Sequence, residues 1–329
     1  MIDVAHLAGV SVKTVSRVVN HTPTVDAALT ERVLEAIREL GFRRNDVAAN
    51  LRSGRNTSTI GLVIEDLSNT FYSTIAAAVF EVSHRFNTQL ITASSEETTS
   101  LEEEIVLDLC QRRVDGLIIV PTGNDQSYLQ PEIDMGLPVV FVDRPPAGLN
   151  VDSVLIDNRK GARAAVEQLL SEGHRKIAVM VDSLHIYTMR ERLIGAEEAL
   201  CAAEVPPEDH IFEAWPHEPS DAAGVVAHLF DSPSPPTAVF CGNNRILMGA
   251  VAELVRRGEK TRVAGFDDFE FAGLLPHPVT VVGYDTPALG TLAAELLFRR
   301  IHGETLPPKH ELLPTYLAER GIPPARRYG

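Results

Sequence analysis

The chain has 329 residues, of which 44% are hydrophobic and 23% charged, and its formal net charge is −15. This length and composition predict a globular protein of two or three domains. No apolar run approaches the roughly 18 residues of a membrane span, and the start lacks the basic-then-apolar layout of a secretion signal. We therefore expect no membrane segment, and the acidic balance argues against a protein that coats nucleic acid.

Cysteine usage points to a reducing compartment. The three cysteines, Cys110, Cys201 and Cys241, are widely spaced and include no CxxC pair. We expect them to be buried thiols, neither bridged nor bound to a metal. These features predict a cytoplasmic protein that needs no cofactor and holds no metal ion.

Near the start, the sequence predicts two short helices joined by a tight turn. Val4, Leu7 and Ala8 fall on one face of a helix, and Gly9 suits the position after its end, where a positive φ is cheap. Ser11 is a good N-cap for a second helix. A helix, a glycine-containing turn and a second helix form a helix-turn-helix.

The second helix has an apolar face and a polar face. Its apolar positions are Val15, Val18 and Val19. The opposite side carries Lys13, Thr14, Ser16, Arg17 and Asn20. Side chains of these types bond base edges and phosphates in a major groove, so this face is the candidate DNA-reading surface. The alternative is a helical hairpin with a solvated face.

A third helix and a short hinge complete the first segment. Asp26 can cap a helix with apolar positions at Leu29, Val33, Leu34, Ile37 and Leu40, and Gly41 can end it. Residues 46–55 could form about two helical turns, too few to be stable alone in water. This piece is either a flexible linker or a hinge helix that folds on DNA, with Leu51 as an apolar wedge in the minor groove.

Charge is distributed unevenly along the chain. Residues 1–55 contain eight basic and six acidic residues, whereas the rest contains 22 basic and 39 acidic residues. The acidic remainder repels phosphate, which leaves DNA contact to the front segment.

From Thr57 onward, apolar strands alternate with helices. The predicted strands are 60–64, 90–93, 116–120, 139–142, 154–156, 176–181, 211–214, 237–240 and 262–266. The predicted helices are 73–86, 101–112, 158–171, 190–204, 220–230 and 246–257. Such an alternation predicts parallel sheets covered on both faces, and the number of strands predicts two α/β lobes. We expect 279–282 and 312–316 to cross back between the lobes, and a ligand pocket in the cleft outside the carboxyl ends of the strands.

The order of these features resembles lactose-repressor/galactose-repressor type (LacI/GalR) transcription regulators over nearly the whole chain. Each motif alone is weak, but the ordered set is specific. The matching segments are Asp3–Ala5, Ala8–Ser11, Thr14–Val18, Asn20, Arg32–Val33, Ala36–Ile37, Leu40–Phe42, Asn45, Leu51–Arg55, Ile60–Val63, Ser68–Asn69, Phe71, Val142–Arg144, Asp157–Asn158, Gly161–Ala162, Gly173–Ile177, Arg192, Gly195 and Ala264–Asp268.

The resemblance implies a helix-turn-helix headpiece over 1–45, a hinge helix over 46–56 and a core like periplasmic sugar-binding proteins over 57–329. The N-lobe would comprise about 57–156 and 286–314, and the C-lobe about 157–285 and 315–329. The family binds near-palindromic operators in double-stranded DNA as homodimers, and a small molecule in the cleft alters the hinge geometry. The DNA-binding positions implied here are Val12, Lys13, Thr14, Ser16, Arg17, Asn20, Leu51 and Arg52.

The same resemblance implies a polar small-molecule effector, a sugar or a sugar derivative above all. Arginine, aspartate and asparagine side chains bond hydroxyl groups, and an aromatic ring can cover a sugar face. The effector contacts implied are Phe71, Tyr72, Asp143, Thr188, Arg192, Trp215, Asn243, Asp267 and Tyr284. Each also has a structural alternative, such as Asp267 capping a helix or Arg192 pairing with an acid.

Four departures from the family pattern stand out. Thr70 replaces the usual proline after Asn69, Asn244 stands where aspartate is common, and Arg44 stands where proline is usual. The chain also begins at Met1, directly before the first helix, so we expect the residues that usually precede this helix to be missing.

The sequence leaves other interpretations open. No nucleotide-binding glycine loop, HExxH or Gly-x-Ser-x-Gly motif supports an enzyme. The core alone would also suit a secreted or cytosolic sugar-binding protein without a DNA role. Purines, nucleosides or a phosphoprotein corepressor are alternative effectors. The end of the chain has no leucine heptad, so we expect no coiled-coil tetramer.

Overall fold

The computed structural model describes residues 1–19, 25–42, 57–214, 218–269, 271–275 and 278–321. Asn20, Leu51, Arg52 and Trp215 lie outside these residues. The chain divides into two compact units, 1–57 and 58–329. Within the ranges described, no helix is long and apolar enough to cross a bilayer.

The first unit is a three-helix headpiece of α1 (Ile2–Ala8), α2 (Val12–Val19) and α3 (Ala27–Glu39). Gly9 ends α1 with a φ of 62°, in the left-handed region that favours glycine. The Ser11 hydroxyl accepts a hydrogen bond from the Thr14 amide at 3.1 Å, and the Asp26 carboxylate caps α3. The predicted end of α1 at Gly9 and the predicted N-caps Ser11 and Asp26 are therefore confirmed.

The headpiece core consists of small apolar side chains, namely Val4, Ala5, Ala8, Val15, Val18, Val33 and Ala36. The expectation for Leu7 was wrong: this side chain is exposed, and Ala5 is buried in its place. The helix is only two turns long, so a rotation of one residue decides which side chain faces α3. Leu34 and Leu40 are also exposed, against the prediction for the third helix.

The first sheet of the second unit forms the N-lobe. Its strands are β1 (Thr59–Ile64), β2 (Gln89–Ser94), β3 (Leu117–Ile119), β4 (Val139–Val142), β5 (Asp152–Ile156) and β11 (His310–Leu313). They lie in the order β11-β5-β4-β3-β1-β2, all paired in parallel. The helices of this lobe are α5 (Thr70–Arg85), α6 (Thr99–Gln111), α7 (Gln130–Asp134) and α12 (Thr286–Ile301).

Alternation along β1 separates the two faces of this sheet. Leu62 and Ile64 pack with the face that α5 and α12 cover, and Val63 packs with Val106 of α6 on the other face. The sheet is therefore buried on both sides, as its uninterrupted apolar strands predict.

The second sheet forms the C-lobe. Its strands are β6 (Ile177–Val181), β7 (His210–Ala214), β8 (Ala238–Cys241), β9 (Arg262–Phe266), β10 (Val279–Gly283) and β12 (Tyr316–Arg320), in the order β12-β10-β9-β8-β6-β7. Only β12 is antiparallel among the described strands. The helices are α8 (Asn158–Ser171), α9 (Tyr187–Ala202), α10 (Pro219–Phe230) and α11 (Asn244–Arg257). Short 3-10 turns lie at Ser127–Leu129, Pro207–Asp209 and Ala272–Leu274.

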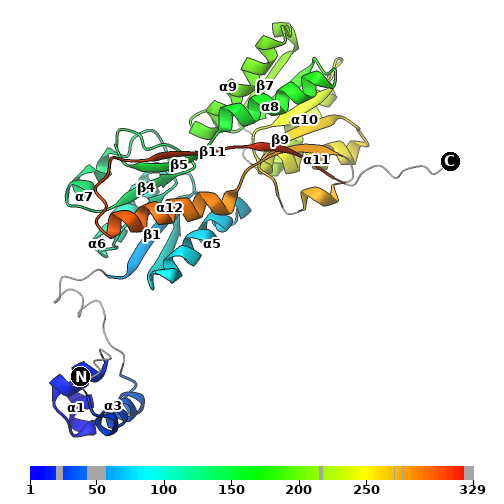
Figure 1. Cartoon of the computed structure of the whole chain (residues 1–329). Coiled ribbons are helices and arrows are strands. Elements are labelled where there is room, and N and C mark those ends of the chain that lie inside the picture. The colour runs from blue at the N-terminus through cyan, green and yellow to red at the C-terminus, as the bar shows by residue number, and fades with distance from the viewer. Residues whose placement is uncertain (20–24, 43–56, 215–217, 270, 276–277, 322–329) are drawn as a thin grey trace. The chain divides into compact units, whose positions relative to one another are not determined.

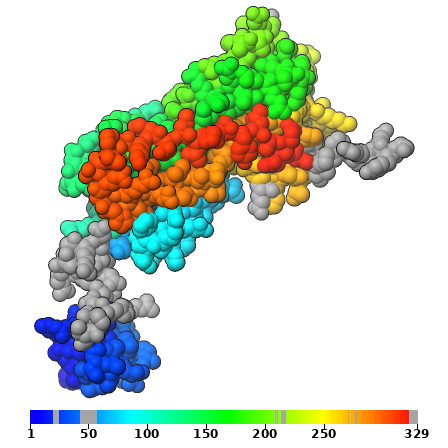
Figure 2. Space-filling model, viewed as in Figure 1, coloured from blue at the N-terminus to red at the C-terminus, as the bar shows by residue number. Residues whose placement is uncertain are grey.

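The chain passes between the lobes after β5, after β10 and between β11 and β12 (Figure 1). The predicted crossing at 312–316 is confirmed, and Figure 2 shows the last two strands, in red, lying across both lobes. The prediction for 279–282 was wrong, because these residues form a strand of the second sheet and the chain crosses only after it. Helices α7 and α12 were missed, although Asp285 as N-cap and Pro287 mark the start of α12.

The cysteines differ from the expectation in part. Cys241 is buried, Cys110 is half-buried and Cys201 is exposed, and all three are free thiols. In the part of the chain that the structure describes, no group of His, Cys, Asp or Glu side chains is placed to hold a metal ion.

Candidate DNA-binding face and effector cleft

The predicted DNA-reading residues that are described lie on one side of α2. Val12, Lys13 and Arg17 are exposed, while Val15 and Val18 anchor the opposite side in the core. Thr14 and Ser16 are half-buried, and the Thr14 hydroxyl lies 2.9 Å from that of Ser11. Thr14 therefore serves the start of its own helix, which makes it a less available base contact than Lys13 or Arg17.

One headpiece arginine has a structural partner. The Arg32 guanidinium donates to the Ala8 carbonyl at 2.6 Å and so satisfies the end of α1 from α3. A side chain at Gly9 would have its Cβ 2.9 Å from this guanidinium, besides being strained at a positive φ. Gly9 and Arg32 together hold the turn that sets the angle between α1 and α2.

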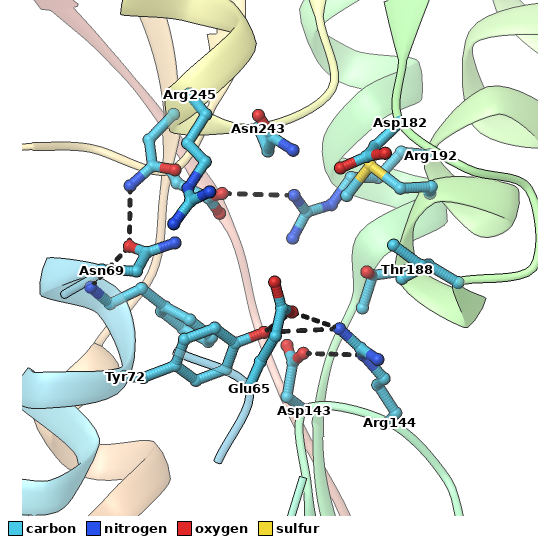
Figure 3. A pocket seen from close by; sticks show the side chains of 15 residues that line it. Glu65, Asn69, Tyr72, Asp143, Arg144, Asp182, Thr188, Arg192, Asn243 and Arg245 are labelled. Carbon is cyan, nitrogen blue, oxygen red and sulfur yellow. Dashed lines mark hydrogen bonds and ion pairs between the residues drawn. The ribbon is translucent and has the colours of Figure 1, made fainter. Parts of the chain in front are cut away.

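The second unit contains a polar pocket at the carboxyl ends of both sheets (Figure 3). Its residues follow strands directly: Glu65 follows β1, Asp143 follows β4, Asp182 follows β6 and Asp267 follows β9. Because parallel strands end at one edge of each sheet, the fold gathers these side chains from distant parts of the sequence.

Seven of the nine predicted effector residues line this pocket. They are Phe71, Tyr72, Asp143, Thr188, Arg192, Asn243 and Asp267. Tyr284 lines an adjoining cavity of about 600 Å³ that shares Phe71, Asn244 and Asp267 with the pocket. The structure therefore brings all the described candidates together.

The N-lobe side of the pocket is built around Arg144, whose guanidinium is buried. It donates to the Glu65 carboxylate at 2.6 Å and to Glu97 at 2.7 Å, and the Tyr72 hydroxyl donates to Glu65 at 2.6 Å. Burial raises the pKa of Asp143 to about 6 and that of Glu97 to about 7. This side therefore contains more carboxylates than its single arginine can neutralise.

The C-lobe side is built around Arg192, which α9 delivers to the carboxyl end of the sheet. Its guanidinium donates to the Asn158 amide oxygen at 2.8 Å, to the Gly242 carbonyl at 2.6 Å and to Asp267 at 3.3 Å. The Tyr284 hydroxyl donates to Asp267 at 2.7 Å. This network fixes both the arginine and the carboxylate in place.

Two of the three aspartates that directly follow a strand into the pocket have a positive φ, 70° at Asp143 and 69° at Asp267. Non-glycine residues in this region are uncommon and are concentrated at binding and active sites. Each lobe thus places an aspartate with a positive φ, directly after a strand, on its side of the cleft.

Polar contacts join the lobes across the cleft. The Asn244 amide donates to the Asn69 amide oxygen at 3.1 Å, and Arg245 forms an ion pair with Asp66. Arg245 also pairs with Glu218 at 2.9 Å, and Asn243 caps α11. With these contacts in place, the pocket encloses a free volume of only about 50 Å³.

Eight further lining residues were not among the predicted contacts: Glu65, Asn69, Arg144, Asp182, Ile186, Met189, Asn244 and Arg245. Three of them had a usable signal, because Glu65, Arg144 and Asp182 come directly after predicted apolar strands or one residue later. The others depend on how helices α5, α9 and α11 meet the cleft, which a sequence pattern does not specify.

Comparison with known proteins decides the family. Residues 1–45 match the model described as bacterial regulatory proteins of the lacI family, and 57–320 match the periplasmic binding proteins and sugar binding domain of the LacI family. The chain belongs to the LacI family. This confirms the resemblance and the fold class, a helix-turn-helix headpiece with a two-lobe periplasmic-binding-protein-like core.

Relatives in this family match along almost the whole chain. The ribose operon repressor of Haemophilus influenzae is 31% identical, with 92% of this chain and 91% of the relative covered. A transcriptional regulator CelR–cellobiose complex is 30% identical, with a TM-score of 0.71 and 96% and 97% coverage. The lac repressor dimer bound to operator and an anti-inducer is 27% identical, with a TM-score of 0.83 and 97% of each chain covered. The family and these relatives are transcriptional regulators, which confirms that the chain is not an enzyme.

Proposed function

We propose that the protein is a ligand-responsive, sequence-specific repressor of genes for sugar uptake or catabolism. The observation that carries this proposal is the pocket of polar side chains from both lobes, in a chain that also has a helix-turn-helix headpiece. It acts in the cytoplasm on double-stranded DNA with a near-palindromic operator. The working divisions are the headpiece 1–45, the hinge 46–56 and the core 57–329.

In this proposal Val12, Lys13, Thr14, Ser16, Arg17 and Asn20 contact the operator, and Leu51 and Arg52 enter it from the hinge. The exposure of Lys13 and Arg17 on α2 supports these roles. An arginine or lysine that bonds a guanine contributes about 1–3 kcal/mol of discrimination.

The effector binds in the cleft, with Phe71, Tyr72, Asp143, Thr188, Arg192, Trp215, Asn243, Asp267 and Tyr284 as its contacts. The inner pocket has a free volume of about 50 Å³, smaller than the roughly 300–1,000 Å³ of typical ligand pockets, and the adjoining cavity of about 600 Å³ shares Phe71, Asn244 and Asp267 with it. An effector that occupies the inner pocket therefore separates the lobes or replaces the contacts of Asn244 and Arg245 across the cleft. That competition links ligand binding to the angle between the lobes.

The regulator acts as a homodimer, as the likeness to the lac repressor dimer supports. On the N-lobe surface, Phe80 of α5 is 56% exposed and Ile91 of the edge strand β2 is 39% exposed. Exposed apolar side chains and an unpaired strand edge favour association, and a second copy of the chain would cover them.

The deciding experiment is selection of genomic DNA fragments on purified full-length protein at several salt concentrations. We expect one near-palindromic site, whose affinity falls steeply with salt and is altered by a small molecule. Leu51→Ala should lose specific affinity and keep non-specific binding, whereas unchanged operator affinity would exclude the wedge role. Recovery of no preferred sequence at any salt concentration would refute the proposed function.

A further inference from the structure

The charges around the effector cleft are strongly unbalanced. Three arginines lie there, Arg144, Arg192 and Arg245. Seven carboxylates line the pocket or pair with these arginines, namely Glu65, Asp66, Glu97, Asp143, Asp182, Glu218 and Asp267. Fully ionised, these side chains have a surplus of four negative charges. At neutral pH the raised pKa of Glu97, about 7, leaves that carboxyl only partly ionised, so the surplus lies between three and four.

Each arginine already has carboxylate partners within the protein. Arg144 pairs with Glu65 and Glu97, and Arg245 pairs with Asp66 and Glu218. An anionic ligand would have to take an arginine from one of these carboxylates. The displaced carboxylate would then be left partly buried beside a second negative charge, which is unfavourable on both counts.

Arg192 is also engaged within the protein. Its Nε and Nη1 atoms bond the Asn158 amide oxygen, the Gly242 carbonyl and Asp267, and its guanidinium lies over the Phe266 ring at 3.8 Å. Only 3% of its side chain is exposed. The guanidinium is thus held as part of the pocket wall, with its charge opposed by Asp267.

Three helix N-termini at the cleft favour a negatively charged ligand, but together they do not neutralise the surplus of carboxylates. Helices α5, α9 and α11 begin at the cleft, with Asn69, Ile186 and Asn243 as their N-caps. Each N-terminus is equivalent to roughly half a positive charge, so together they offset about one and a half of the surplus negative charges. The cleft therefore has a negative potential, and the substitution of Asn244 for the usual aspartate does not reverse it.

From this charge pattern we infer that the effector carries no negative charge: it is a hydroxyl-rich molecule that is neutral or bears an amino group. Carboxylates accept hydrogen bonds from hydroxyl and ammonium groups, whereas phosphorylated and carboxylated metabolites are repelled. This inference rests on the proposed function, since it names the class of ligand for the same cleft.

The test uses a metabolite extract of the organism that carries the gene, separated by ion exchange into anionic, neutral and cationic pools. Each pool is added to the full-length protein on its operator, and fluorescence anisotropy reports release or tightening. Compounds that the protein retains are identified by mass spectrometry. We expect the active compound in the neutral or cationic pool, and its phosphorylated derivative to bind at least about tenfold more weakly.

The outcomes separate the two proposals. Activity in the anionic pool, alone or beside another pool, overturns the inference and leaves the proposed function standing. No activity in any pool means that the repressor does not respond to a small molecule, so the proposed function itself fails.

A matched pair of variants tests the electrostatic cause. Glu218→Gln removes one of the surplus carboxylates at the edge of the cleft, where this side chain is 55% exposed. Glu167→Gln removes a similar arginine pair on α8, where Glu167 is 49% exposed and does not line the pocket. We expect Glu218→Gln to improve binding of the phosphorylated derivative severalfold and Glu167→Gln to leave it unchanged. Equal behaviour of the two variants would contradict the inference.

Discussion

The two lobes build their sides of the cleft from the same backbone device but balance its charge differently. In each lobe an aspartate with a positive φ follows a strand, Asp143 in the N-lobe and Asp267 in the C-lobe. Asp267 has Arg192 and the Tyr284 hydroxyl as close partners. Asp143 lies beside an arginine that Glu65 and Glu97 already engage. The C-lobe aspartate thus has a fixed, charge-paired position, whereas the N-lobe side has the larger excess of carboxylates over arginines.

The largest expected effect comes from removing the arginine of the N-lobe. Arg144→Ala would leave Glu65, Glu97 and Asp143 buried without a cation, and uncompensated buried charge costs about 3–5 kcal/mol. We expect the free energy of unfolding to fall by about 4 kcal/mol at pH 8, measured by urea denaturation. Much of the lost stability should be regained at pH 5.5, because protonation of these carboxyls removes their mutual repulsion. A loss that is independent of pH would contradict the charge-surplus interpretation.

The corresponding change in the C-lobe should cost less stability. Arg192→Ala leaves Asp267 with the Tyr284 hydroxyl, so we expect a loss of about 2–3 kcal/mol in the same denaturation experiment. Operator binding should remain while the response to the effector is lost, because the pocket wall no longer holds its geometry.

The surface pair of Arg163 and Glu167 provides the control for both arginines. Arg163→Ala should leave the free energy of unfolding almost unchanged, since exposed pairs contribute little. If Arg192→Ala proves more destabilising than Arg144→Ala at pH 8, the contrast between the lobes is wrong.

A pH experiment isolates the N-lobe carboxyls. Burial raises the pKa of Glu97 to about 7, above its ordinary value, so this group takes up a proton on folding. Its ionisation therefore opposes folding, and the free energy of unfolding should fall as the pH rises from 5 to 8. Glu97→Gln should reduce this fall by on the order of 1 kcal/mol, since its amide does not titrate.

Glu172 gives the opposite sign as a control. Arg262 lowers its pKa, so this carboxylate stabilises the fold at neutral pH and loses that contribution as the pH falls towards 4. Glu172→Gln should therefore change the acid side of the profile and leave the range from 5 to 8 unaltered. If Glu97→Gln and the parent protein show the same dependence of unfolding free energy on pH between 5 and 8, Glu97 is not the group that titrates in this range.

Long hydrophobic patterns in the sequence predicted secondary structure and burial more reliably than short ones. The strands were found because continuous apolar runs such as Ile60–Ile64 are bounded by polar residues. The short α1 was misoriented, since Leu7 and Ala5 compete for one buried position and only the packing of α3 decides between them. Tertiary packing overrides local preference most easily where an element is short.

The site was predicted in a similarly uneven way. Asp267 and Asp143 were found because motifs fix them at strand ends, and all described candidates gathered at one cleft. The pairing of Arg144 with Glu97 was not foreseeable, since the two are 47 positions apart and follow β4 and β2, which are not adjacent in the sheet. The contacts of Arg245 with Asp66 depend on the closure of the lobes, which no sequence pattern encodes.

The contacts between the lobes should contribute less to stability than either buried arginine. Arg245 pairs with Asp66 across the cleft, and both side chains are partly exposed, so Arg245→Ala should lower the free energy of unfolding by at most about 1 kcal/mol. Its effect on ligand binding should be larger in relative terms. Arg245→Ala removes a contact that only the closed arrangement makes, so it shifts the population towards separated lobes. Since these contacts oppose ligand entry, the affinity for the effector should rise, and a shift of 1 kcal/mol corresponds to about a fivefold gain. Titration of the identified effector by calorimetry would measure it. Arg112→Ala, which removes an exposed pair with Asp108 within the N-lobe, should leave the affinity unchanged. If both variants bind the effector as the parent protein does, the contacts across the cleft do not oppose ligand entry, and each lobe's own network of buried charges alone sets the affinity.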